Sequence, residues 1–421
     1  MKKKLIVDLV IISAVLILIE FTCFLTQDRL EEDNGLGNDG KFYYQMASSL
    51  SELHRPVSQK PFIYRPAIPA IVGLSVKSGL TSDLLKTFLL ANTLFSVLSV
   101  FVLYLLLKSF SLKRIWLIAI TSIYALNYLS PIRMTWCNPT HIDSGSMFFI
   151  ILLFWIMNLK GSRIFIYFSI ISFIAVFFRG LDIALVSIVY YLQKRESFTR
   201  SIVPFLSSIS AYIVMQFLVI PSGEFSIIKV MIHWALVKPL LGTVLSLFTA
   251  YGTVLFIILF DHGFSRKFLK DNKGYLFFIV ICFLSSWIGG NASARLFYFS
   301  LPVVLVMIAK SLNDNRLKLK TPALILIGIT QLLSMRVFFT IPVRNQITQR
   351  LFLPDIQKSI DEKFILTIFT PLSNDIAYLD LSPLHAQPNI IIQYLLSYLI
   401  FGLFFYYFFI RNQGTLHNMT D

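Results

Sequence analysis

Long apolar runs separated by short polar stretches extend over nearly the whole chain. Most of them approach the length of about 20 residues that a helix needs to cross a membrane. The pattern therefore predicts an all-α, polytopic membrane protein with about twelve transmembrane helices. We expect these helices over residues 5–25, 84–107, 115–129, 144–159, two short segments within 164–192, 201–220, 240–260, 275–288, 296–309, 323–341 and 390–410.

The run at 164–192 differs from the others because Arg179, Gly180 and Asp182 interrupt it. Basic clusters flank this run on both sides, which indicates that both of its ends lie in the cytoplasm. We therefore expect two segments that meet at 179–182 near the outer face. Elsewhere we expect an outer loop that contains His233, Trp234 and Lys238, and a basic cytoplasmic loop over 266–273.

The composition excludes a soluble protein. Hydrophobic residues make up 56% of the chain and charged residues only 14%, whereas about a quarter of a soluble domain is charged. The formal net charge of +15 comes from basic clusters between apolar runs, as in cytoplasmic loops. This charge indicates orientation in a membrane and no nucleic-acid partner. Both termini are expected in the cytoplasm, with residues 5–25 forming an uncleaved first helix.

Two long outer segments interrupt the apolar pattern, one at about 27–82 and another at about 342–389. The first contains the sequences GNDGKFYYQMASSL and PFIYRPAIPAIVGL. Since neither segment resembles a soluble domain, we expect residues 1–421 to form a single integral-membrane domain.

Two helices are expected in the first outer loop. Asn38 can cap a helix that includes residues 41–53, and Pro66 suits the first turn of a second helix. Both helices are expected to lie flat in the membrane interface, with Tyr43 and Tyr44 near the level of the lipid headgroups.

Charged side chains within this apolar scaffold are the candidates for chemistry, because such groups are costly in a membrane. Asp39 lies at the start of a predicted helix, whose dipole stabilises its carboxylate. Arg65, Arg179 and Arg295 can each bind a phosphate group. Three of these four residues also have a structural interpretation: a first-turn acid for Asp39, an interfacial side chain for Arg65 and a pair with Asp182 for Arg179.

His141 and Asp143 lie two residues apart at the start of a predicted span. They can supply a second acid or a metal ligand, or simply the polar start of a helix. The chain contains no Gly-rich phosphate loop, no HExxH and no Gly-x-Ser-x-Gly sequence. A nucleotide-binding or hydrolase site of a common soluble type is therefore not expected.

The first outer loop resembles that of integral-membrane glycosyltransferases of the GT-C superfamily, in particular the bacterial polyprenyl- or dolichyl-phosphate-mannose mannosyltransferases. In that group an acid after the first span is followed by aromatic residues and a Tyr-Arg-x-x-x-Pro element. The matching positions here are Asp39, Tyr43, Tyr44, Tyr64, Arg65 and Pro69. The chain departs from many relatives in having one acid here instead of an adjacent pair.

The resemblance implies a GT-C-like fold and an inverting transfer of sugar from a polyprenyl-phosphate donor to a glycan, lipid or protein acceptor. Asp39 would be the catalytic carboxylate, and Tyr43, Tyr44, Tyr64 and Arg65 would contact the substrate. The charged residues singled out above add His141, Asp143, Arg179 and Arg295 as further candidates for substrate binding. It also implies glycan biosynthesis for the cell envelope on the outer face of a bacterial inner membrane. The single acid leaves the need for a divalent cation open.

Three other interpretations remain open at this point. A polysaccharide polymerase or ligase of the O-antigen type is also polytopic, with arginines in its outer loops. A lipid or glycan transporter would show broken spans in two similar halves, which this sequence lacks. A membrane scaffold without enzymatic activity would leave the motif-rich first loop unexplained.

Overall fold

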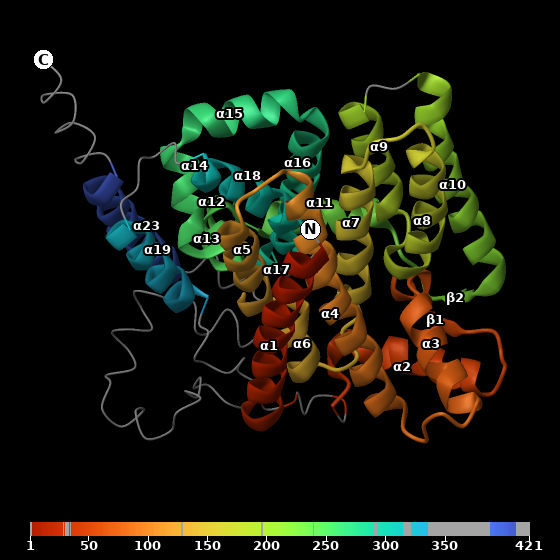
Figure 1. Cartoon of the computed structure of the whole chain (residues 1–421). Coiled ribbons are helices and arrows are strands. Elements are labelled where there is room, and N and C mark those ends of the chain that lie inside the picture. Colours follow the sequence, from red (N-terminus) through yellow and green to blue (C-terminus); the bar gives the residue numbers. More distant parts are fainter. Residues whose placement is uncertain are drawn as a thin grey trace, which may run out of the picture. The chain divides into compact units, whose positions relative to one another are not determined.

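The structure, a computed structural model, describes residues 2–27, 29, 33, 35–127, 129–194, 197–238, 240–289, 293–314, 321–335 and 388–409. These residues are mostly helical, which confirms the predicted helical class (Figure 1). The chain divides into two compact units, which are described separately. The single-domain organisation stays a prediction. Nearly all of the predicted outer segment at 342–389 lies outside the described residues.

The first unit comprises residues 1–111, 130–227 and 272–278. Its elements are α1 (Lys2–Thr26), α2 (Gly37–Ser51), β1 (Val57–Gln59), the 3-10 helix η1 (Phe62–Tyr64), α3 (Ala67–Lys77), α4 (Leu84–Ser109), α6 (Pro131–Cys137), α7 (Asp143–Asn158), α8 (Ile164–Arg179), α9 (Asp182–Lys194), α10 (Phe198–Leu218), β2 (Ile220–Ser222) and the start of α16 (Lys273–Ile288).

The core of the first unit is a set of packed apolar helices. α7 packs between α4 and α8, and α10 packs against both α8 and α9 (Figure 1). A buried asparagine, Asn92 of α4, connects this core to the loop before α7. Its Nδ2 donates to the Pro139 carbonyl oxygen at 2.8 Å, and its Oδ1 accepts a hydrogen bond from the Ser144 hydroxyl. This loop is therefore fixed by polar contacts that are shielded from solvent.

The break predicted within 164–192 is present. α8 ends at Arg179, and α9 begins at Asp182. Gly180 between them has φ +75°, a conformation that a glycine adopts without steric cost. The chain can therefore reverse direction within two residues.

The segment expected to be the first outer loop contains two helices, α2 and α3, that pack against each other. The capping prediction for Asn38 is wrong, because α2 begins at Gly37 and Asn38 lies inside its first turn. The helix also ends at Ser51, two residues before Leu53. Local sequence does not fix such ends, because neighbouring contacts move them by a residue or two. The interfacial position of both helices stays a prediction.

A short parallel strand pair, which the all-α prediction did not include, anchors this loop to the helical core. β1 pairs with β2, with Val57 opposite Ile220. Just before β1, Arg55 donates from Nη2 to the Phe217 carbonyl oxygen at 2.7 Å and to that of Val219 at 3.2 Å. These carbonyls lie at the C-terminus of α10, where the helix itself supplies no donors.

The second unit comprises residues 112–129, 228–271 and 279–421. Its elements are α5 (Arg114–Leu126), α11 (Ile227–Val237), α12 (Leu240–Leu245), α13 (Leu247–Tyr251), the 3-10 helix η2 (Gly252–Val254), α14 (Leu255–Phe260), α15 (His262–Asp271), the end of α16, α17 (Ser293–Tyr298), α18 (Leu301–Asn313), α19 (Thr321–Ser334) and α23 (Pro388–Phe409).

Several predictions for the second unit are wrong. The loop expected around His233 is the helix α11, and the basic loop expected at 266–273 is mostly the helix α15. The single span expected at 240–260 is divided into α12, α13, η2 and α14. The sequence conceals this division because its apolar pattern continues across the breaks.

A buried glutamine of α19 compensates for the break between α13 and α14. Gln331 donates from Nε2 to the Tyr251 carbonyl oxygen at 3.0 Å. Its Oε1 accepts from the Val254 backbone N–H at 2.8 Å and from the Thr253 hydroxyl at 3.0 Å. A broken helix in an apolar environment needs such partners for its backbone groups, and here the side chain of another helix supplies them.

Four helical segments of the described chain are long and apolar enough to cross a membrane: Leu5–Thr26, Leu84–Ser109, Arg114–Cys137 and Phe198–Leu218. A fifth span results if the bent pair Leu247–Phe260 and His262–Asp271 is counted as one. Eight shorter apolar helices accompany them. The predicted number of about twelve spans therefore stays a prediction.

The close approach of α2 and α3 requires a glycine at position 73. A Cβ there would lie 2.4 Å from the Ala47 carbonyl oxygen and 2.9 Å from the Leu50 Cβ. We expect Gly73→Ala to lower the free energy of unfolding by about 1–3 kcal/mol, because the backbone of α2 cannot move aside easily. Thermal unfolding in detergent measures this loss. Gly328→Ala in α19 is the control, since a Cβ at Gly328 meets no atom within 4 Å. Equal behaviour of the two variants would contradict the packing argument.

Candidate functional site

A buried arginine at the end of α8 is the centre of the candidate site. Arg179 donates from Nη1 to Asp143 Oδ1 at 3.1 Å and from Nε to Asp182 Oδ2 at 3.2 Å. Asp143 comes from the first turn of α7, and Asp182 is the first residue of α9. One guanidinium thus joins three helices.

The two carboxylates that bind Arg179 differ in their environments. The Asp143 side chain is 9% exposed, whereas that of Asp182 is 59% exposed. Nε2 of His141 lies 3.3 Å from Asp143 Oδ2. The predicted pair His141 and Asp143 is therefore brought together, and it is joined to Arg179. Of the open interpretations, the pairing of Arg179 with Asp182 is present in the structure.

The loop that carries His141 is held in place on both sides. Besides the contacts of Asn92 described above, the Thr140 hydroxyl donates to the Leu36 carbonyl oxygen at 2.7 Å. Leu36 immediately precedes α2. The start of α2 and the start of α7 are therefore neighbours in space.

Asp39 lies in the first turn of α2, as predicted, and is half-buried. The adjacent Gly40 packs so closely on the 138–142 loop that a Cβ would lie 1.9 Å from Thr140 Oγ1. Asp39 and His141 therefore lie on adjoining segments, each one residue away from this close contact.

A second arginine approaches the same region from the turn after η1. Arg65 is partly buried and donates from Nη1 to the Tyr43 hydroxyl at 3.4 Å. Tyr43 is a buried residue of α2. The turns around Arg65 and Gly180 also touch, because a Cβ on Gly180 would lie 3.2 Å from the Tyr64 carbonyl oxygen.

The environment of Arg65 favours its charged form. Burial by itself would lower the pKa of Arg65, but the Tyr43 hydroxyl and the Asp182 and Asp143 carboxylates counteract it and hold the pKa above its usual value. Within the described part of the chain Arg65 forms no ion pair within 4.0 Å, unlike Arg179. Most of its five N–H donors are thus not used in the hydrogen bonds seen here.

The other predicted residues lie around or outside this cluster. Tyr64 packs its ring on that of Tyr212 of α10, with centroids 5.6 Å apart. Tyr44 is half-buried on α2 and takes no part in the cluster's hydrogen bonds described above. Arg295 lies on α17 in the second unit, so its role at the site stays a prediction. Asp182, expected only as a partner of Arg179, also belongs to the cluster. Its signal in the sequence is an acid three residues after Arg179.

Among the described residues, no group of three or more His, Cys, Asp or Glu side chains is arranged to hold a metal ion. The carboxylate of Asp143 already accepts a hydrogen bond from Arg179, and Nε2 of His141 lies 3.3 Å from its other oxygen. The charged groups of the described cluster pair with one another and do not form a set of metal ligands. We therefore assign no residue to a divalent cation.

Comparison with known proteins adds little to this description. No protein-family model matches the chain, and no curated protein matches it. Among solved structures, the chain is similar to an oligosaccharyltransferase of Archaeoglobus fulgidus, crystallised with a tethered acceptor peptide containing the NVT sequon. The TM-score is 0.48 and the sequence identity 12%. The match covers 92% of this chain and 55% of the archaeal one, so this chain spans about half the length of that protein.

Removing either carboxylate partner of Arg179 tests the structure of the cluster. We expect Asp143→Asn to lower the free energy of unfolding by about 3–5 kcal/mol, because it leaves a buried guanidinium with one charged partner fewer. Asp182→Asn should cost about 1 kcal/mol or less, since its carboxylate is largely exposed to solvent. Denaturant unfolding in detergent measures both. Similar losses in the two variants would contradict the assignment of Asp143 as the structural partner.

Proposed function

We propose that this chain is an integral-membrane glycosyltransferase that moves a sugar from a polyprenyl-phosphate donor to a glycan, lipid or protein acceptor on the outer face of the membrane. The observation that carries the proposal is Arg65. This guanidinium is partly buried, is held by Tyr43, and forms no ion pair within the described residues. A phosphate oxygen fits such a fork of donors.

The two arginines of the cluster have different roles in this proposal. Arg179 is committed to Asp143 and Asp182, which favours a role in positioning α7, α8 and α9. Most of the N–H groups of Arg65 form no hydrogen bond described here, and Arg65 lies beside these two carboxylates. We therefore assign the phosphate of the sugar donor to Arg65 instead of Arg179. We assign no step to Arg295 or to a metal ion.

Asp39 supplies the base in the proposed reaction. As the bond between the sugar C1 and the phosphate oxygen breaks, its electron pair leaves with the phosphate, and Arg65 stabilises the developing negative charge. The acceptor hydroxyl attacks C1 from the opposite side, and Asp39 takes its proton. The configuration at C1 is inverted. Because this carboxylate lies in the first turn of a helix, the helix dipole stabilises its ionised form.

His141 and Asp143 lie on the segment that packs against the start of α2. We assign both residues to substrate positioning. Asp143 is already hydrogen-bonded to Arg179, and we therefore assign the base to Asp39. Tyr43 orients Arg65, while Tyr44 and Tyr64 remain candidates for contact with the sugar or the lipid.

The catalytic carboxylate is tested by Asp39→Asn, which removes the base and keeps the shape of the side chain. We expect loss of sugar transfer with normal membrane insertion, measured by mass spectrometry of surface glycans. The control is Glu52→Gln at the C-terminal end of the same helix, whose carboxylate is 65% exposed and should not matter. Full transfer by Asp39→Asn would refute the assignment. A change in glycan length with an unaltered repeating unit would favour a polymerase or ligase.

The phosphate-binding role is tested by Arg65→Gln. We expect it to lower the rate of transfer by about 100-fold, as is typical when one donor to a developing negative charge is removed. Arg65→Lys should recover only part of the rate, because lysine keeps the charge and loses the planar fork. Lys77→Gln, which removes an exposed cation at the end of α3, serves as the control. Equal rates in Arg65→Gln and Lys77→Gln would refute this role.

A further inference from the structure

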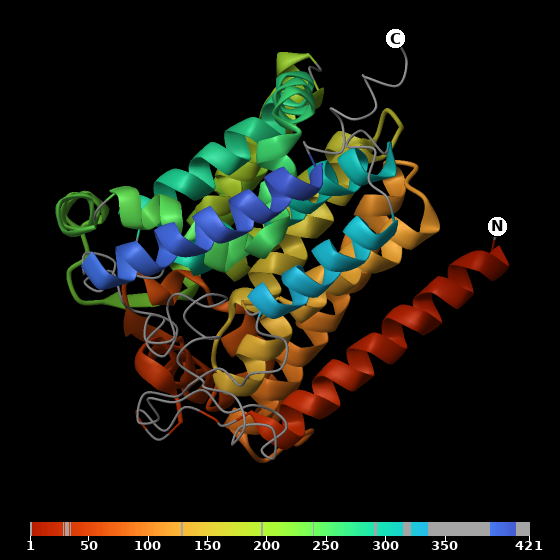
Figure 2. The same cartoon turned by 90° about the vertical axis from the view of Figure 1, so that its left-hand side faces the viewer.

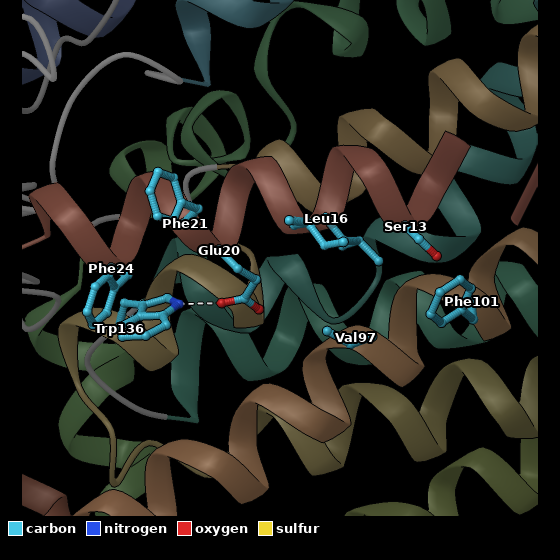
Figure 3. Close-up of a pocket in the computed structure, with 9 residues that line it drawn as sticks. Ser13, Leu16, Glu20, Phe21, Phe24, Val97, Phe101 and Trp136 are labelled. Carbon is cyan, nitrogen blue, oxygen red and sulfur yellow. Dashed lines mark hydrogen bonds between the residues drawn. The ribbon is translucent and has the colours of Figure 1, made fainter. Parts of the chain in front are cut away.

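An acid lies within the first membrane-spanning helix, away from the cluster described above. Glu20 of α1 accepts a hydrogen bond from the indole Nε1 of Trp136, a residue of α6 (Figure 3). Its second oxygen, Oε1, is buried and accepts no hydrogen bond in the part of the chain that the structure describes. A carboxylate offers about four acceptor positions, and only one of them is used here. An ionisable residue in a membrane span usually has a functional partner.

This carboxylate lines a groove of about 510 Å³ between α1 and α4. Apart from Ser13, Glu20 and Trp136, the side chains that line the groove are apolar. Figure 3 shows Glu20 and Trp136 near one end of the groove, and Ser13 and Phe101 toward the other. From Ser13 to Phe24 the groove follows twelve residues of α1, which is about 16 Å along the helix axis.

α1 is loosely packed, and its outer face consists of exposed apolar side chains. Only 22% of its spanning window is buried, and Figure 2 shows α1 (red) as an outlying helix. Among the described elements its main contacts are with α6 and α4. Phe24, which is 61% exposed, packs edge-on against Trp136 with ring centroids 5.6 Å apart. The groove therefore adjoins a surface that suits lipid chains.

We propose that this groove binds a membrane lipid whose headgroup is a primary ammonium, with one acyl chain lying along α1 and the ammonium donating to Glu20. Charge complementarity favours this occupant, because a carboxylate in an apolar groove attracts a cation with N–H donors. It disfavours lipids whose only headgroup charge is a phosphate. Glu20 lies six residues before the end of α1, about 9 Å along the axis, and a tryptophan at its level is typical of the membrane interface.

Two other occupants fit the groove less well. A membrane-spanning helix about 30 Å long would extend well beyond the groove, which follows α1 for only about 16 Å. A second copy of this chain that docks through α1 would bring a second Glu20 to the groove in place of a cation. One lipid chain fits within the length of the groove, and its ammonium supplies the cation.

The test compares three lipids with identical acyl chains on the purified, lipid-depleted full-length protein. Phosphatidylethanolamine carries the ammonium, phosphatidylcholine keeps the charge but has no N–H donors, and phosphatidylglycerol has no cation. Native mass spectrometry measures the occupancy of each. We expect phosphatidylethanolamine to bind about tenfold more tightly than the other two, because the charge-assisted hydrogen bond is available only to it.

Variants in α1 and α4 test whether the preference for phosphatidylethanolamine arises in the groove. Glu20→Gln should reduce the preference to about twofold or less. Asp8→Asn is the matched control: Asp8 is a buried acid of the same helix that accepts from the Tyr104 hydroxyl at 2.7 Å, and its replacement should leave the preference unchanged. Val97→Phe fills the groove and keeps Glu20, so it should abolish the binding even if Glu20→Gln proves unstable.

Three results would overturn the proposal. These are equal binding of the three lipids, an unchanged preference in Glu20→Gln and Val97→Phe, and a photocrosslink from position 24 to a membrane-spanning peptide instead of a lipid. The groove is separate from Asp39 and Arg65, so these results leave the proposed transferase activity untouched.

Discussion

The buried guanidinium of Arg179 is the constraint on which the first unit depends. A charge inside an apolar helical bundle costs several kcal/mol unless it is paired. Here the pairs come from the first turns of two other helices, through Asp143 and Asp182. The ends of α7, α8 and α9 must therefore meet at one point. The glycine after Arg179 then allows the chain to turn against the backbone of Tyr64, which places Arg65 beside the same cluster.

This arrangement separates charges that hold the structure from charges that remain available. Arg179 and Asp143 satisfy each other in a buried position, and Asn92 and Thr140 fix the loop between α6 and α7 by hydrogen bonds. Arg65 is oriented by a tyrosine, and no carboxylate lies within ion-pair distance in the described chain. A cluster of paired charges thus lies beside a cation that can bind an anionic ligand without first giving up a strong partner.

Broken helices recur in both units, and in each unit one break is stabilised by a side chain from another helix. Arg179 and its carboxylates stabilise the α8–α9 turn, and Gln331 satisfies backbone groups at the break between α13 and α14. Such compensation is needed because no water reaches backbone groups in an apolar environment. Glu20 differs from these compensated groups, because its second oxygen has no hydrogen-bond partner among the described residues.

The sequence by itself determined the helical class, the break at 179–182 and the first-turn position of Asp39, because periodicity, glycine and charge are local signals. It also singled out Arg65, Arg179, His141 and Asp143, because polar groups stand out in an apolar chain. Only the tertiary structure decided that Arg179 binds two carboxylates while Arg65 has no ion-pair partner, since partners from distant helices leave no local trace. The division of 240–260 and the helix at 262–271 were decided there too, because an apolar run looks the same whether or not its helix is broken.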